Sequence, residues 1–511
     1  MHTKDHQKHY IYYCSLALIF IGISIRLFAY LYNRPLWEDE LCLALNIINK
    51  PLTDLLTKGL DLNQGAPLGF LLLMKLLTNF LGSSEYSLRL LSLVLGLLAL
   101  IAFYQLSKRL VTPNAVPITL AFFALSYYLI YYSVEAKQYS TDVFVTILLL
   151  YMGTVIYSKE SNILNIILFG ITGSIFIWLS YPALFVLSAI AFSVVVKDII
   201  DKAWKHLYIY LIIFSIWVIS FSLFYYESLR ILVANGYLIN YWNKYYVSLP
   251  ILSMNNFKMG LANIFFAFGD PRLTSYTGFN ILRAIYFGSL VMGCITLYSK
   301  NKFQLTIFLT TIICAVVASF LKKYPLGLRL VLFLAPIVIL LVGQGLGNIR
   351  AYIWNKNKVL GALFLIFILL IPISRAFSYI IWPSYGCMQD TRSVFNYLQK
   401  HYIKGDKIYL YNDARYAYKY YQNRYSFTSK DVIIGTAMLD IGFKKVPENI
   451  YDDMELIKKN KRVWIILTDM GDLSEKQEQQ DVLKLMEKDG KVLNHYEAQG
   501  ASTYLIKYEN N

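Results

Sequence analysis

Long apolar runs recur through roughly the first 380 residues of the 511-residue chain, and they constrain its fold more than any other feature. A helix of about 18 to 20 apolar residues can cross the hydrocarbon core of a bilayer. The first run, Tyr10 to Tyr30, contains Arg26 and lacks a small-residue cleavage site, so it predicts a retained helix rather than a removed signal peptide. We therefore expect a polytopic α-helical membrane protein.

The sequence predicts about eleven transmembrane helices, and its cations predict their orientation. The expected spans are residues 10–32, 88–107, 115–132, 138–157, 163–180, 181–197, 206–226, 281–298, 303–321, 329–349 and 358–381. With a cytoplasmic N-terminus, Lys108/Arg109 and Lys300/Lys302 fall in cytoplasmic connections, as the positive-inside rule requires. An odd number of spans places the C-terminus outside, in the extracytoplasmic space.

Two long connections, roughly 33–87 and 227–280, are then also external. The apolar segment 67–81 is marginal in length for a span, and counting it would invert every later loop, so we expect an interfacial helix in the first connection. The second connection is rich in Tyr, Trp and Asn, which is typical either of an aromatic belt or of a substrate-facing loop.

The rest of the chain, residues 382–511, has a different pattern, in which polar helices alternate with short apolar strands. This pattern predicts a small extracytoplasmic α/β domain after a membrane domain of residues 1–381. The domain lacks GxGxxG, P-loop and nucleophile-elbow motifs, so the sequence assigns it no chemistry. A role in binding an acceptor and a role in capping a cavity both stay open.

Charge and cysteine content exclude two other classes of function. The net charge is +16, but Lys and Arg are spread among short connections and form no basic domain, so we expect no nucleic-acid partner. The five cysteines show no metal-ligand spacing, and there is no His pair at such spacing, so no metal ligands are assigned. A divalent cation held by carboxylates is left open.

Polar residues gather in four segments of the expected external face. The first holds Asp39 and Glu40, directly after the first span, and the second holds Asp61, Asn63 and Gln64. External carboxylates can act as a general base, bind a cation or be simply solvated. Asp61 and Asn63 can equally be ordinary turn and helix-start residues.

The third and fourth segments lie in shorter external turns. In 133–142, Glu135, Gln138, Tyr139 and Asp142 recur at steps that a helix would align on one face, with Lys137 between them. The alternative is a surface Glu135–Lys137 pair with anchoring tyrosines. In 322–329, three cations including Lys323 and Arg329 flank Tyr324 on the face that positive-inside disfavours, which indicates either an anionic ligand or contact with lipid headgroups.

Together these segments resemble the GT-C class of membrane glycosyltransferases, specifically bacterial family-39-like members related to protein O-mannosyltransferases and lipid A aminoarabinose transferases. The resemblance rests on residues 36–40, 63–68, 82–89, 132–139 and 324–329. It departs from the commoner pattern at Ala66-Pro67 and at Lys137-Gln138, where Pro-Pro and Arg-Pro are usual. Lysine lacks the two-pronged contact of a guanidinium, so this departure bears on the donor headgroup.

The resemblance implies that Asp39 is the catalytic base and that Glu40 positions it or helps to bind a cation. It also implies a polyprenyl-phosphate sugar donor at the outer face of the bacterial cytoplasmic membrane, a glycan, lipid or protein acceptor, and inversion at the anomeric carbon. Arg329, Lys323 and Lys137 are then candidates for stabilising the departing phosphate. Rival hypotheses are a polysaccharide polymerase or ligase, a lipid-linked sugar transporter, and a scaffold that displays the C-terminal domain.

Overall fold

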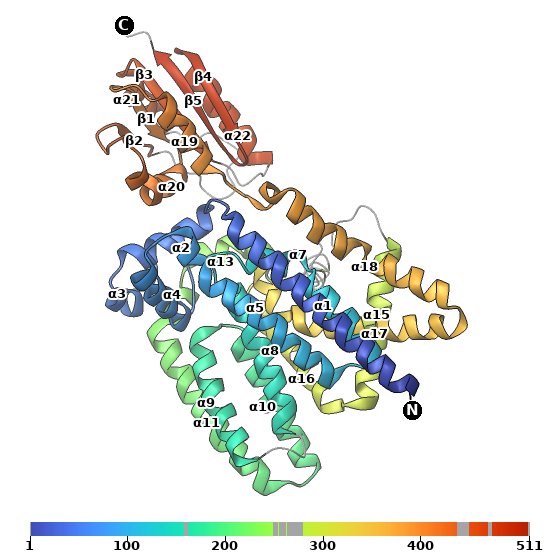
Figure 1. The fold of residues 1–511 in the computed structure, drawn as a ribbon. Coiled ribbons are helices and arrows are strands. Elements are labelled where there is room, and N and C mark those ends of the chain that lie inside the picture. The colour runs from blue at the N-terminus through green and yellow to red at the C-terminus, as the bar shows by residue number, and fades with distance from the viewer. Residues whose placement is uncertain are drawn as a thin grey trace. The chain divides into compact units, whose positions relative to one another are not determined.

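The computed structural model describes residues 2–157, 162–248, 280–436, 449–468 and 473–508, together with Met254 and Ala262. The chain divides into two compact units (Figure 1). The membrane unit is residues 1–31 and 51–381, and the C-terminal unit is residues 32–50 and 382–511. The start of the first long connection therefore belongs with the C-terminal domain, although the sequence assigns it to the membrane domain.

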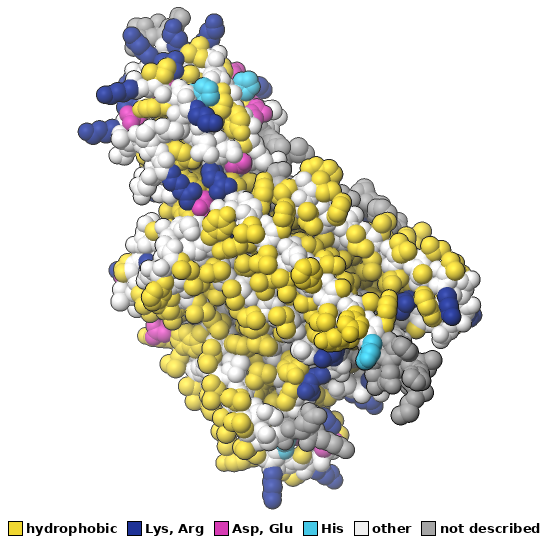
Figure 2. Space-filling view, viewed as in Figure 1, with side chains coloured by type: hydrophobic (Ala, Val, Ile, Leu, Met, Phe, Trp, Pro, Cys, Tyr) yellow, Lys and Arg dark blue, Asp and Glu magenta, His cyan; other side chains and the backbone are white. Residues whose placement is uncertain are grey.

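The membrane unit is a bundle of long apolar helices. In the described part of the chain, nine helical segments are long and apolar enough to cross a membrane. The helices in them are α1 (His2–Tyr32), α5 (Glu85–Leu110), α8 (Tyr139–Ile156), α10 (Ala183–Ile200), α11 (Trp204–Phe224), α15 (Asn280–Lys300), α16 (Lys302–Phe320), α17 (Ala335–Lys356) and α18 (Lys358–Ile381). Figure 2 shows apolar side chains covering most of the visible face of this unit, which is therefore a multi-pass membrane structure.

Three shorter apolar helical segments accompany the long ones. They are formed by α4 (Leu68–Leu81), by η1 (Pro113–Ala115) with α6 (Val116–Ala124), and by α9 (Ile163–Leu179). α4 matches the helix expected for 67–81. The expected span 163–180 coincides with α9, whereas the segment Pro113–Ala124 covers only the first part of the expected span 115–132.

The expected single helix 115–132 is in fact interrupted. α6 ends at Ala124, and α7 (Tyr127–Tyr132) begins after Ser126, whose hydroxyl accepts the N–H of Leu129. Arg26 of α1 donates to the carbonyls of Phe123 and Ala124, with N···O distances of 3.4 and 3.0 Å. Backbone carbonyls freed at a helix end need such partners inside a membrane. The buried arginine of the first span thus stabilises the break in a later one.

Glycines allow α15 and α17 to approach closely. A Cβ added at Gly345 would lie 1.9 Å from the carbonyl oxygen of Ser289, and one added at Gly293 would lie 1.9 Å from that of Leu341. In membranes, small residues at helix contacts replace the hydrophobic effect as the source of association, because they let backbones pack closely. The α15–α17 contact therefore depends on these two glycines.

The remaining elements of the membrane unit are short. Before α4 lies α3 (Leu52–Thr57), and after α11 come η2 (Tyr225–Leu229), α12 (Arg230–Val233), α13 (Gly236–Tyr241) and η3 (Asn243–Tyr245). η5 (Leu328–Leu334) leads into α17. Most of the second long connection, residues 249–279, lies outside the described residues apart from Met254 and Ala262.

The C-terminal unit contains a five-stranded mixed sheet of order β2-β1-β3-β5-β4. Its elements are α2 (Glu38–Asn49), η6 (Pro383–Gly386), α19 (Thr391–His401), β1 (Lys407–Leu410), α20 (Ala414–Tyr421), η7 (Gln422–Arg424), β2 (Val432–Ile434), α21 (Ile450–Lys458), β3 (Arg462–Thr468), α22 (Leu473–Glu487), β4 (Gly490–Ala498) and β5 (Ala501–Tyr508). β1 runs parallel to β2 and β3, and β5 is antiparallel to β3 and β4. The predicted small α/β domain is confirmed.

The core of this unit is formed where one face of the sheet meets its helices. Ile465 and Ile506 from the strands and Met486 from α22 are buried in a single apolar cluster. At the start of β1, the buried carboxylate of Asp406 accepts hydrogen bonds from Arg462 Nε at 2.7 Å and from Trp464 Nε1 at 3.0 Å. A buried carboxylate is stable only with such partners, so Asp406 ties two parallel strands together.

Candidate active site

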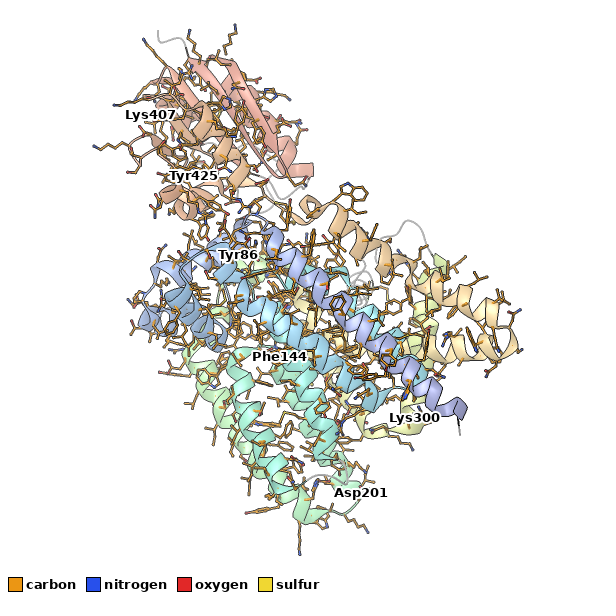
Figure 3. The ribbon with its side chains drawn as sticks, in the orientation of Figure 1. Tyr86, Phe144, Asp201, Lys300, Lys407 and Tyr425 are labelled. Carbon is orange, nitrogen blue, oxygen red and sulfur yellow. The ribbon has the colours of Figure 1, made fainter. Side chains whose placement is uncertain are left out.

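Two polar segments of the membrane unit meet at the N-terminal end of α8. The Lys137 ammonium donates to the Gln64 side-chain carbonyl, and Gln138 Nε2 donates to the Gly65 carbonyl at 3.3 Å. The segments are 73 residues apart in the sequence. Figure 3 labels Tyr86 near this end of the bundle and Asp201 at the opposite end. The structure thus brings together residues from the second and third sequence segments.

The segment 133–138 is a turn, so the predicted helix with Glu135, Gln138, Tyr139 and Asp142 on one face is wrong before Tyr139, where α8 begins. Its backbone is fixed by neighbouring hydroxyls, because Ser92 Oγ donates to the Lys137 carbonyl at 2.9 Å. α5 also comes very close, since a Cβ added at Gly96 would lie 2.6 Å from Ser133 Cβ. Tertiary contacts, rather than helical hydrogen bonds, therefore position Glu135 and Lys137.

Burial argues against a surface ion pair in this turn. Glu135 is 0% exposed and Lys137 is 3% exposed, and Tyr139 is 4% exposed. Charged side chains are almost never this buried without a structural or functional reason. The turn holds ionisable groups in an environment where their charges act strongly on anything bound beside them.

Arg329 lies against the same end of α8. Its Nε donates to the Tyr139 hydroxyl at 2.7 Å, and the centre of its guanidinium lies 5.6 Å from the centroid of the Trp242 ring. An arginine held through Nε and packed against aromatic rings has its planar fork fixed in orientation. The fourth sequence segment thereby joins the third, and Trp242 from the second long connection joins them both.

Tyr324 and Asp142 form a second layer of polar groups in this region. The Tyr324 hydroxyl donates to the Leu330 carbonyl at 2.8 Å, and the Asp142 carboxylate accepts from Ser180 at 2.7 Å. Burial raises the pKa of Tyr324 well above its ordinary value, and the nearby charge of Asp142 adds to this rise. Tyr324 is therefore a neutral hydrogen-bond donor at physiological pH.

Three other predicted residues are exposed. Asp61, Asn63 and Lys323 all lie at the surface of the membrane unit. Asn63 Oδ1 accepts from Asn235 Nδ2 at 3.4 Å, which links the two long connections. Leu62 and Asn63 have φ of 60° and 52°, a left-handed conformation that is costly for leucine. Backbone strain of this kind is concentrated at functional sites.

The acidic segment belongs to the C-terminal unit. Glu38, Asp39 and Glu40 form the first turn of α2, where negative charge interacts favourably with the helix dipole. Glu40 is fully buried. The predicted catalytic residues Asp39 and Glu40 are thus in one unit, and the predicted substrate-binding residues are in the other.

Three of the residues found beside the site were not assigned a site role from the sequence, although the spacing of 133–142 drew attention to Asp142. Asp142, Ser180 and Trp242 contact it through side chains. Asp142 had a recognisable signal, because it follows Tyr139 by three residues at a helix start. Trp242 lies in the connection whose Tyr, Trp and Asn content left an aromatic belt and a substrate-facing loop open. Ser180 had no signal, because only the fold brings it to α8. Among the described residues, no three His, Cys, Asp or Glu side chains are close enough to hold a metal ion together.

Comparison with known proteins agrees with this architecture. The sequence profile of the dolichyl-phosphate-mannose-protein mannosyltransferase family matches residues 65–221. A crystal structure of ArnT from Cupriavidus metallidurans in the apo state is 10% identical, with 96% of this chain and 98% of that chain covered and a TM-score of 0.53. A structure of the same protein bound to undecaprenyl phosphate is also 10% identical, with 96% and 97% covered and a TM-score of 0.54.

The chain therefore has the fold of the GT-C class of membrane glycosyltransferases. Within that class, residues 65–221 are similar to the mannosyltransferase family. These residues include Lys137, Tyr139 and Asp142. No curated protein sequence gives a significant match.

Proposed function

We propose that the protein is a glycosyltransferase that moves a sugar from a polyprenyl-phosphate donor to an acceptor hydroxyl at the outer face of the bacterial cytoplasmic membrane. The observation that carries this proposal is the convergence of Gln64, Lys137, Tyr139 and Arg329 at one end of the bundle. Lys137 and Arg329 are cations held in fixed orientations by neutral groups. Such cations suit a phosphate at the membrane boundary.

The proposed reaction is a single displacement. The Asp39 carboxylate removes the proton of the acceptor hydroxyl, whose oxygen attacks the anomeric carbon while the bond from that carbon to the phosphate oxygen breaks. The products are the glycosylated acceptor with inverted configuration, polyprenyl phosphate, and the proton on Asp39. Glu40 orients Asp39 from the same helical turn.

The cations supply the electrostatic part of the catalysis. Negative charge develops on the phosphate as it departs, and positive groups already aimed at it stabilise the transition state without reorganisation. The bonds from Lys137 to Gln64 and from Arg329 to Tyr139 support this role, because they fix the direction of both side chains. Lys323, which is exposed at the surface of the membrane unit, is proposed to add positive charge that attracts the donor phosphate.

The lipid-linked donor has separate support. The ArnT structure of similar fold was solved with undecaprenyl phosphate bound, a lipid of the proposed donor class. The cation distribution supports a cytoplasmic N-terminus and an extracytoplasmic C-terminal domain, an orientation in which the site would face outward. The acceptor is a glycan, a lipid or a protein.

The decisive experiment compares wild type with Asp39→Asn on a panel of polyprenyl-phosphate sugars and host envelope acceptors. We expect turnover to fall by about 10²- to 10⁴-fold in the variant, the usual contribution of a general base. Asp54→Asn is the matched control, because Asp54 is a carboxylate of the same connection that forms an exposed pair with Lys58. Equal turnover in wild type and Asp39→Asn would remove Asp39 from the mechanism. No transfer with any donor would favour the polymerase, transporter or scaffold hypotheses.

A further inference from the structure

The backbone that leads into the acidic helix α2 is held by residues of the C-terminal domain. Arg392 donates to the Asn33 carbonyl at 2.7 Å, and Arg34 donates to the Gly386 carbonyl at 3.2 Å. Farther along, the Leu36 N–H donates to the Tyr421 hydroxyl at 3.2 Å. Three contacts thus fix residues 33–36 to chain segments that follow them by more than 350 positions.

The start of α2 depends on the same domain. The first N–H groups of a helix have no partner within the helix, and a side chain just before it usually supplies one. The N-cap residue Trp37 makes no such bond. Instead the Glu38 N–H donates to Gln389 Oε1 at 2.7 Å, and Gln389 is only 2% exposed. Gln389 therefore caps α2 from a distant part of the sequence.

Side-chain contacts extend this attachment beyond the cap. α2 packs against α20, and the Glu38 side chain interacts with the carboxyl group of Asp413, just before α20. Burial raises the pKa of the Asp413 carboxyl, and the interactions with Glu38 and Arg415 oppose this rise. The first turn of α2 is thus fixed through both its backbone and its side chains.

We propose that the C-terminal domain positions the catalytic carboxylate, with Gln389 and Tyr421 as the positioning residues that hold the backbone next to Asp39. This inference rests on the proposed role of Asp39 as base. It gives the C-terminal domain a function in the membrane reaction, although the sequence of the domain contains no catalytic motif. It also explains why residues 32–50 belong to that domain rather than to the helical bundle.

The expected effect of losing the cap is specific. Displacement of a catalytic group by about 1 Å can lower turnover by about 10²-fold. Gln389→Ala should therefore lower kcat by between about 10-fold and 10²-fold, with the donor KM unchanged because the proposed phosphate-binding residues are in the membrane unit. Tyr421→Phe removes one hydroxyl, leaves the cap intact and should have a smaller effect in the same direction.

Gln399→Ala is the matched control. Gln399 Oε1 also accepts a backbone N–H, that of Ser426 at 2.9 Å, but this bond joins α19 to a later loop of the same domain rather than to residues 33–40. Wild type, Gln389→Ala, Gln399→Ala and Asp39→Asn would be compared as full-length proteins in lipid nanodiscs. Turnover is measured as release of polyprenyl phosphate from the best donor of the panel.

Amide hydrogen exchange provides a second measurement that does not depend on activity. Gln389→Ala should speed exchange at the Leu36 and Glu38 amides at least 10-fold relative to Gln399→Ala, while the amides of β3 stay protected in both and show that the domain is folded. Unchanged exchange at these two amides overturns the attachment. Equal kcat in Gln389→Ala and Gln399→Ala, with Asp39→Asn inactive, overturns the positioning role alone. Full activity of Asp39→Asn instead overturns the proposed base, and with it this inference.

Discussion

The turn 133–138 before α8 and the acidic segment 33–40, whose residues 33–37 lead into α2, both include irregular backbone at a helix start, but they are ordered in different ways. The turn is held within its own unit by Ser92 of α5 and by the close approach of that helix at Gly96. The acidic segment is held by Gln389 and Tyr421, from the far end of the sequence. The proposed phosphate-binding residues and the proposed base therefore depend on two separately ordered units, which mutations can disturb one at a time.

The largest effect is expected from substitutions of the proposed phosphate-binding residues. Arg329→Ala should lower kcat/KM by about 10²- to 10³-fold, because removal of one preoriented electrostatic group commonly costs that much. Arg329→Lys should recover only part of the loss, since an ammonium cannot make the two-pronged contact. Steady-state kinetics with the best lipid-linked donor tests this.

Lys302→Ala removes a cation from the other end of the bundle and provides the control. Its kcat/KM should stay within about 2-fold of wild type, because an exposed cation far from the site is screened by salt. If Arg329→Ala and Lys302→Ala behaved alike, Arg329 would have no special role in donor binding.

The next effect concerns the stability of the C-terminal unit. Asp406→Ala should destabilise it by about 1 to 3 kcal/mol, because the buried Trp464 N–H loses its hydrogen-bond acceptor. Asp481→Ala removes an exposed carboxylate that pairs with Lys484 and should cost under about 1 kcal/mol. Exchange of β3 amides in denaturant measures both, and the α8 amides of the membrane unit should not change. Matching changes in α8 would mean that the two units unfold together.

A similar cost is expected in the membrane unit from Gly345→Ala. The added methyl group would meet the Ser289 carbonyl at 1.9 Å, and backbone cannot move aside easily, so we expect a loss of about 1 to 3 kcal/mol. Gly288→Ala, in the facing helix, meets nothing within 4 Å and should be neutral or slightly stabilising. Thermal inactivation in nanodiscs should separate these two variants, and equal half-lives would argue against the close α15–α17 contact.

The smallest effect is a pH dependence of the stability of the C-terminal unit. The pKa of Asp413 is raised in the folded protein, so the folded state binds more protons than the unfolded state between the ordinary carboxyl pKa and this raised value. Stability therefore falls as pH rises through the raised pKa. Asp413→Asn removes the titrating group and should therefore flatten this dependence. A pH series of β3 amide exchange measures it, and an unchanged slope would contradict the assignment.

The fold class could be predicted from the sequence, because the length of an apolar run and the cations beside it are both contained in a short stretch of chain. Most spans needed no tertiary information, and the strands Lys407–Leu410 and Arg462–Thr468 were visible as apolar runs. The interruption after Ala124 was not predictable, because it depends on a hydrogen bond from Arg26, about 100 residues earlier. Residues 133–138 were misassigned for a similar reason, since helical spacing in a sequence does not show which hydroxyls will fix a turn.

For the candidate site, the sequence by itself determined which residue types were available and, through a motif resemblance, which of them to suspect. Only the tertiary structure decided their neighbours: Lys137 with Gln64, Arg329 with Tyr139 and Trp242, and Glu38 with Gln389. The physical reason is the separation of the interacting residues along the sequence. Hydrophobic length and helix periodicity are encoded over one or two dozen residues, whereas the groups that orient this site come from segments that are 73 to more than 350 positions apart.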